Sequence, residues 1–213
     1  MILMSTTPVH FTVVTNLVLA LLPLVLAIYL FKISHKRSVS WWILLPVFIA
    51  LLPNSAYVLT DIIHFIAALR SPTMTPIHLI FITTPFYLVF LSLCFEFYVL
   101  SVRFGQQYLE NINPKSRAIK WLSIIFPTMM HLLSAIGVYL GRFQRLESSD
   151  IIHQPIIVFK DLLLDLSNGS SSLIILGLFS LFAVLYYIFE KTNCKIYALF
   201  TYHKAINPEH NPA

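Results

Sequence analysis

The stretch that decides the fold is residues 9–31, which read VHFTVVTNLVLALLPLVLAIYLF. It contains no Asp, Glu, Lys or Arg, and it exceeds the roughly 20 apolar residues that a helix needs to cross a bilayer. No basic segment precedes it, and no small-residue cleavage site and polar mature chain follow it. We therefore expect a retained membrane span rather than a signal peptide.

Four further apolar stretches are long enough to span a membrane, and they cover residues 41–69, 77–102, 121–140 and 171–189. Trp41, Trp42 and Trp121 stand at the ends of two of them, as aromatic belts do in membrane proteins. The pattern predicts an all-α, polytopic transmembrane helical bundle of about five spans. We expect a single bundle domain over residues 1–190 and a cytoplasmic basic tail over 191–213.

The composition agrees with lipid as the solvent. Hydrophobic residues make up 58% of the 213 residues and charged residues only 11%, whereas a soluble domain carries about 25% charged residues. The mean hydropathy is +0.80. The net charge of +5 does not indicate nucleic-acid binding, because the basic residues form short clusters and no stripe interleaved with aromatics. The expected partner is the lipid bilayer. Binding to other membrane subunits is a second possibility that the sequence leaves open.

The basic residues predict an orientation. Ten of the 14 fall on one side of a five-span topology, and cytoplasmic loops are the ones that carry excess Lys and Arg. These ten are Lys32, Lys36, Arg37, Arg103, Lys115, Arg117, Lys120, Lys191, Lys195 and Lys204. The other side has Arg70, Arg142, Arg145 and Lys160. We therefore expect a multi-pass protein of the cell membrane with its N-terminus outside and its C-terminus in the cytoplasm.

Two segments depart from simple spans. Pro53 followed by Asn54 predicts an interruption of the second helix, and irregular backbone at membrane depth needs protein or a water-filled cavity around it. Residues 156–166 alternate apolar residues with Lys160, Asp161 and Asp165. They are too short and too charged to span, and they predict a short helix at the membrane interface.

Polar residues gather in two places on the predicted outer side. The outer half of the second span contains Asn54, Tyr57, Thr60, Asp61 and His64, and the loop after the fourth span contains Arg142, Arg145, Ser148 and Asp150. One interpretation is an ion pair between Asp61 and Arg142 or Arg145. The other is a ligand site, because two arginines beside a carboxylate can hold a phosphate or carboxylate bidentately.

A four-residue pattern occurs in both places. Asp61-Ile-Ile-His64 recurs as Asp150-Ile-Ile-His153, and each copy offers a carboxylate and an imidazole at helical spacing. Together the four side chains would suit a divalent metal, zinc or manganese. The alternative is a local hydrogen bond in each copy and a chance repeat in an isoleucine-rich chain.

Two ionisable residues fall inside spans, Glu96 in the third and His131 in the fourth. Such residues are candidates for function because the bilayer disfavours them. They could form a proton relay. Alternatively, His131 is a neutral buried histidine hydrogen-bonded within the bundle, and Glu96 extends toward the inner boundary.

The two polar segments also carry a resemblance. Residues 53–64, PNSAYVLTDIIH, and residues 141–150, GRFQRLESSD, resemble a bacterial family of multi-pass membrane proteins with a domain of unknown function, marked by PNxxYxxTDxxH and GRFxRxxSxD segments. The resemblance implies that the motif positions are Asn54, Tyr57, Thr60, Asp61, His64, Gly141, Arg142, Phe143, Arg145, Ser148 and Asp150. Glu147 and Ser149 stand where we expect Asn and Trp. The family brings no activity with it.

Three functions remain open. The first is a small-ligand-binding or transport component with a polar site on the extracytoplasmic face. The second is a membrane-embedded enzyme acting on envelope or lipid-linked substrates, with Asp61, His64 and Asp150 as acid, base or metal ligands. The third is a structural accessory subunit. The absence of GxSxG, HExxH and Walker motifs favours the first over the second.

Overall fold

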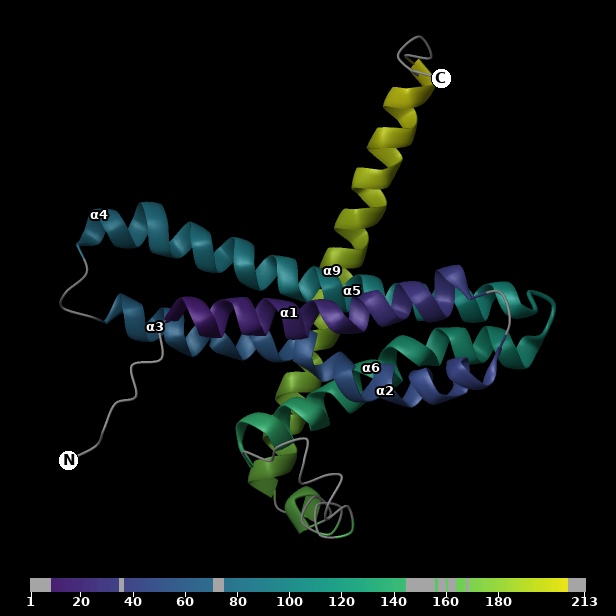
Figure 1. Cartoon of the computed structure of the whole chain (residues 1–213), viewed down its shortest axis with the longest axis horizontal. Coiled ribbons are helices and arrows are strands. Elements are labelled where there is room, and N and C mark those ends of the chain that lie inside the picture. Colours follow the sequence, from purple (N-terminus) through teal and green to yellow (C-terminus); the bar gives the residue numbers. More distant parts are fainter. Residues whose placement is uncertain are drawn as a thin grey trace.

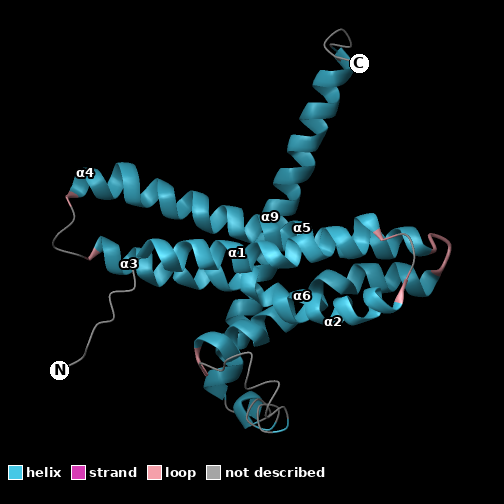
Figure 2. Cartoon of the chain, in the orientation of Figure 1, coloured by secondary structure: helices cyan, strands magenta, loops and turns pink. Residues whose placement is uncertain are grey.

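A computed structural model describes residues 9–34, 37–70, 75–144, 164–167 and 169–206, together with positions 156 and 160. Every regular element in these residues is a helix, as Figure 2 shows. The elements are α1 (Val9–Ile28), η1 (Tyr29–Ile33), α2 (Val39–Tyr57), η2 (Val58–Asp61), α3 (Ile62–Leu69), α4 (Pro76–His78), η3 (Leu79–Thr83), α5 (Thr84–Ile112), α6 (Arg117–Arg142) and α9 (Gly169–Ile206).

Five helices are long and apolar enough to cross a membrane. Short helical pieces join end to end to make the longer ones, so that η1 extends α1, and η2 and α3 extend α2. The five candidate spans are Val13–Ile33, Val39–Ala67, Pro76–Ile112, Arg117–Arg142 and Gly169–Leu199. The prediction of an all-α bundle with five spans is confirmed. The last three spans are longer than their apolar runs, the second is as long, and the first is two residues shorter.

The long helices are arranged in two directions. In Figure 1, α1, α2, α5 and the first part of α6 run alongside one another, and α9 crosses them steeply. Helix α9 packs mainly on α6 and touches α5 less. It has 38 residues, which is about 57 Å of helix against a hydrocarbon core of about 30 Å. A helix of that length accommodates the bilayer by tilting.

The bundle has a buried core and an apolar exterior. All five spans contribute to the main core cluster, with fully buried side chains such as Phe48, Phe95, Tyr98, Val138 and Phe182. Large apolar side chains are equally common on the outside. Val89 of α5, for example, is 67% exposed. An apolar surface of this extent fits contact with lipid rather than water.

The interruption expected at Pro53 and Asn54 is wrong. Helix α2 continues through both residues to Tyr57, and its winding then tightens into the 3-10 helix η2. A proline removes one backbone hydrogen bond, and membrane helices tolerate this loss where neighbouring helices surround it. Here α6 packs directly against the Pro53 ring.

Two further fold predictions concern a short helix over residues 156–166 and a basic tail over residues 191–213. The predicted interfacial helix over 156–166 falls mostly outside the described residues, although positions 156, 160 and 164–167 are helical. Helix α9 runs without a break past residue 190, where we expected the basic tail to begin. The tail residues up to Ile206 are thus helical, and the division into bundle and tail stays a prediction.

Candidate functional site

Asp61 is a buried carboxylate at the end of η2, with 6% of its surface exposed. Asn16 of α1 donates a hydrogen bond from its Nδ2 to Oδ2 of Asp61 at 2.7 Å. Arg142, the last residue of α6, places its Nη2 3.4 Å from Oδ1. Burying a charge is strongly unfavourable unless it is paired and hydrogen-bonded. Asp61 meets both conditions, and it thereby connects α1, η2 and α6.

The guanidinium of Arg142 has further partners on the second span. Its Nη1 donates to the hydroxyl of Tyr57 at 2.7 Å, and its Nη2 donates to the backbone carbonyl of Thr60 at 3.2 Å. It also lies 5.0 Å from the centre of the Tyr57 ring, within the range of a cation–π contact. The Thr60 hydroxyl is turned back to the Tyr57 carbonyl at 2.7 Å. Arg142 therefore fixes the end of α6 to the α2–η2 junction.

These contacts decide between the two interpretations of the polar cluster for Arg142. The ion pair between Asp61 and Arg142 is present. The guanidinium that would have held a phosphate or carboxylate already binds a carboxylate, a hydroxyl and a carbonyl of the protein. The structure thus brings Tyr57, Thr60, Asp61 and Arg142 together in a network of mutually satisfied groups, and their role in ligand binding stays a prediction.

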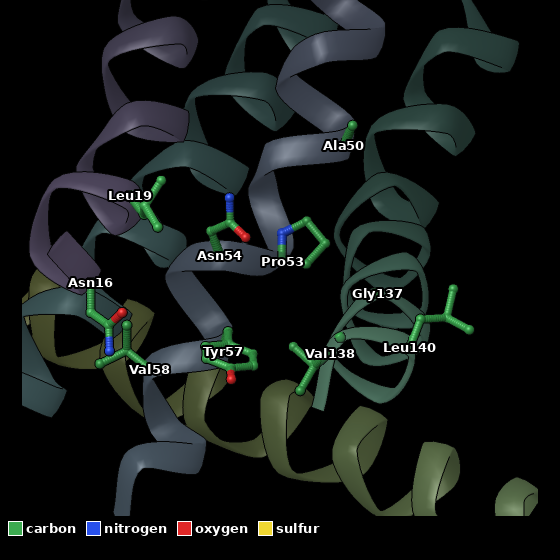
Figure 3. A pocket seen from close by; sticks show the side chains of 11 residues that line it. Asn16, Leu19, Ala50, Pro53, Asn54, Tyr57, Val58, Gly137, Val138 and Leu140 are labelled. Atoms are coloured by element: carbon green, nitrogen blue, oxygen red, sulfur yellow. The ribbon is translucent and has the colours of Figure 1, made fainter. Parts of the chain in front are cut away.

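A pocket lies beside this network, between α1, α2 and α6. Its volume is about 270 Å³. The polar lining comes from Asn16, Asn54 and Tyr57, whose side chains appear in Figure 3. The rest of the lining is apolar or backbone: Leu19, Ala50, Pro53, Val58, Gly137, Val138, Leu140 and Gly141. No hydrogen bond joins the amide of Asn54 to another described residue, so both its donors and its acceptor are available to a ligand.

Two glycines of α6 shape the wall of the pocket. A Cβ on Gly137 would lie 2.6 Å from Cγ of Pro53, so only glycine lets α6 come this close to α2. A Cβ on Gly141, one turn later, would meet nothing within 4 Å. Gly137 therefore closes one side of the pocket by direct contact, and Gly141 leaves space beside the same helix.

Asn16 is the site residue that our reading of the sequence missed. It lies in the middle of the first apolar run, where an amide is unfavourable in lipid. A lone polar residue within an apolar run was the sequence signal for this site, because polar residues inside spans commonly bind one another or a ligand. The pairing with Asp61 is a contact between residues 45 positions apart, which no local pattern reveals.

Several predicted site residues fall outside the described part of the chain. They are Arg145, Ser148, Asp150 and His153, and the side chain of His64 is also outside it. Among the described residues, no group of three His, Cys, Asp or Glu side chains could hold a metal ion. The zinc or manganese site of Asp61, His64, Asp150 and His153 stays a prediction.

The two ionisable residues inside the spans have separate partners. His131 Nδ1 and the Tyr98 hydroxyl are 2.7 Å apart in the core, and the His131 ring packs 4.8 Å from that of Tyr186. Glu96 accepts a hydrogen bond from Nδ2 of Asn193 at 2.7 Å. Glu96 and Tyr98 are two apart on α5 and so do not share a face. The arrangement favours a hydrogen-bonded core histidine over a relay between Glu96 and His131.

Comparison with known proteins identifies a family but no activity. Residues 15–186 match the model of a family described as "Protein of unknown function (DUF1361)", and the match includes both polar segments. No curated protein and no solved structure matches the chain.

Proposed function

We propose that this chain, which belongs to the DUF1361 family, binds a small polar molecule in the pocket beside Asn54 and acts as a binding or transport component of the membrane. The observation that supports this most directly is the pocket itself. The amide of Asn54 on its wall has no hydrogen-bond partner among the described residues, and the neighbouring charges Asp61 and Arg142 are already paired.

The size and lining of the pocket limit the ligand. About 270 Å³ is below the 300–1,000 Å³ of drug-sized sites, and it equals the space of roughly nine water molecules. Asn16 and Asn54 offer both donors and acceptors, and the neighbouring ions Asp61 and Arg142 neutralise each other. These features favour a small neutral or zwitterionic molecule over a free anion.

Binding is better supported than catalysis. A general acid or base must be within hydrogen-bond reach of its substrate, but each oxygen of Asp61 already accepts a bond from the protein. The enzyme hypothesis then depends on His64 and Asp150. The accessory-subunit hypothesis gains support from the Asp61–Arg142 network, but it gives no reason for the unpartnered amide of Asn54.

We place the pocket on the extracytoplasmic face. It lies at the ends of α2 and α6, away from the loops that carry most of the basic residues, and the distribution of these residues makes those loops cytoplasmic. A component with such a site could deliver its ligand to other membrane subunits or carry it across the bilayer.

The test is a thermal-unfolding assay of the purified protein in detergent with amino acids, neutral sugars and small carboxylates. We expect at least one neutral or zwitterionic compound to raise the melting temperature of the wild type. Gly141→Leu should abolish this shift, because its side chain would enter open space beside the pocket. Asn54→Ala should weaken it, because a buried polar contact is worth about 1 kcal/mol.

Gly177→Leu is the matched control, because a Cβ there also meets nothing within 4 Å and α9 does not line the pocket. A compound that stabilises the wild type and Gly141→Leu equally is bound elsewhere. If no compound stabilises the wild type, the proposal fails and the accessory role is favoured. A separate series with zinc and manganese ions, repeated on Asp61→Asn, tests the metal site.

A further inference from the structure

Two basic side chains are held on aromatic rings at the end of the bundle opposite to the pocket. They are Lys32 in the last turn of η1 and Arg37 just before α2. Both contact α5 near its C-terminal end. Figure 1 shows the start of α2 and the turn between α5 and α6 at this same end of the bundle. We call Lys32 and Arg37 the cation pair.

Arg37 is held by Tyr108 and Trp41. Its Nε donates to the Tyr108 hydroxyl at 3.1 Å, and its guanidinium carbon lies 5.8 Å from the Tyr108 ring and 5.7 Å from the Trp41 ring. Trp41 is itself fixed, because its indole N–H donates to the carbonyl of Leu30 at 2.9 Å and only 5% of it is exposed. The guanidinium therefore rests on a rigid aromatic support.

Lys32 of η1 contacts residues of α5 next to Tyr108. Its Nζ donates to Oε1 of Gln107 at 2.9 Å and lies 4.8 Å above the Phe104 ring. Phe104 and Tyr108 are four residues apart on α5, so their side chains share a face and begin about 5–6 Å apart. The two positive charges are thus placed side by side on one helix face.

The charge of this pair is not neutralised within the described part of the chain. Neither Lys32 nor Arg37 forms an ion pair there. Glu110, also on α5, accepts a hydrogen bond from Gln106 and forms no ion pair with either of these two described cations. Lys32 has used one of its three donors and Arg37 one of its five. Both side chains are exposed, so six N–H groups face the surroundings at a span end.

We propose that the cation pair binds the phosphate of an anionic phospholipid such as phosphatidylglycerol. A phosphodiester supplies the negative charge and the acceptors that the pair lacks. The neighbouring Trp42 is 57% exposed beside the buried Trp41, and exposed tryptophans at span ends are typical of the headgroup level, where basic pockets between helices bind anionic headgroups. The exposed apolar side chain of Ile33, next to Lys32 in sequence, offers contact to the lipid chain.

The experiment measures which lipid lies next to Trp41 and Trp42. The full chain with Trp121→Phe is reconstituted in phosphatidylcholine vesicles, and part of the lipid is replaced by phosphatidylglycerol or phosphatidylcholine with brominated chains. Bromine quenches the fluorescence of nearby tryptophans. Each held cation should add about a fivefold preference for the anionic lipid, so the two together should give roughly a 25-fold preference.

Lys32→Gln with Arg37→Gln should reduce the preference to near unity. The matched control is Lys115→Gln with Arg117→Gln, which removes one Lys and one Arg from the connection at the same end. These two residues have no aromatic support, and their loss should change the preference less than threefold. A control that loses as much as the test variant would overturn the proposal, as would a test variant that keeps its preference.

Two further measurements distinguish loss of lipid binding from loss of folding, and a lipid from a free phosphate compound. Lys32→Arg and Arg37→Lys preserve both charges, and they should retain most of the preference even if the neutral double variant does not fold. Soluble glycerol 3-phosphate should not displace the quenching lipid. If it does so at millimolar concentration, the pair binds a free phosphate compound and the assignment to lipid is wrong.

Discussion

At the scale of single residues, Arg142 at the end of α6 holds the polar network together. It binds the Asp61 carboxylate, the Tyr57 hydroxyl and the Thr60 carbonyl with one planar group. The five donors of a guanidinium, fixed in one plane, suit this task, and the single ammonium of a lysine does not. Loss of Arg142 would leave a carboxylate buried without its counter-ion.

Arg142→Gln should therefore destabilise the protein by about 2–5 kcal/mol, toward the lower end because 22% of its side chain is exposed. The measurement is SDS-induced unfolding in mixed micelles. Asp61→Asn combined with Arg142→Gln should cost less than the sum of the two single changes, because each single change leaves one charge without its partner whereas the double variant leaves none.

The pair of Arg103 and Glu190 provides the comparison. Its side chains are 32% and 25% exposed, so the coupling between them should be the smaller of the two. If Arg142→Gln unfolds at the same SDS fraction as the wild type, the network does not hold α6 in place.

At the scale of helices, the approach of α6 to α2 depends on a missing side chain. The ring of Pro53 is rigid, and a methyl group on Gly137 would overlap it at 2.6 and 2.8 Å. The proline thus has two effects: it removes a backbone donor from α2, and it fills the space that Gly137 leaves open.

Gly137→Ala should cost about 1–3 kcal/mol, because the helices must separate or α2 must shift to relieve the overlap. Gly177→Ala should be neutral or stabilising by about 0.5–1 kcal/mol, because alanine favours helix and has open space there. The same SDS titration compares them. Equal stability of the two variants would mean that α2 and α6 are not held in contact here.

The helices also show what their sequence predicts and what it does not. Long apolar runs predicted the number of spans and where each begins, because membrane thickness sets a minimum length. The third and fifth spans end at Ile112 and Leu199, ten residues beyond the predicted ends. The continuation of α2 through Pro53 was not predictable, since it depends on Gly137, a residue of another span. Likewise Asp61 and Arg142 suggested their ion pair by charge alone, but Asn16 had no charge to reveal it.

At the scale of the whole molecule, the two ends of the bundle differ in chemistry. One end carries the pocket and the paired ions. The other carries the cation pair and the basic residues at the turn between α5 and α6, Lys115 and Arg117. Composition predicted a membrane bundle and its orientation, whereas the steep crossing of α9 follows from packing, which apolar length alone does not determine.

The orientation predicts which positions are reachable from outside the cell. In a Cys94→Ala and Cys194→Ala background, Arg70→Cys should react with a membrane-impermeant maleimide in intact cells. Lys115→Cys should react only after permeabilisation. Arg70 directly follows α3, and Lys115 lies in the turn between α5 and α6; the end of α3 and that turn are at opposite ends of the bundle (Figure 1). If only Lys115→Cys, and not Arg70→Cys, is labelled in intact cells, the topology is the reverse of the predicted one and the pocket faces the cytoplasm.

The contact between Asp61 and Arg142 also has a consequence for biosynthesis. The two residues are 81 positions apart, so at 5–20 residues per second the ribosome makes Arg142 roughly 4–16 s after Asp61. Asn16 is made before Asp61, and α1 and α2 pack directly on each other. The amide of Asn16 can therefore bind the Asp61 carboxylate as soon as the first two helices meet. This hydrogen bond gives the carboxylate a partner until α6 has been synthesised.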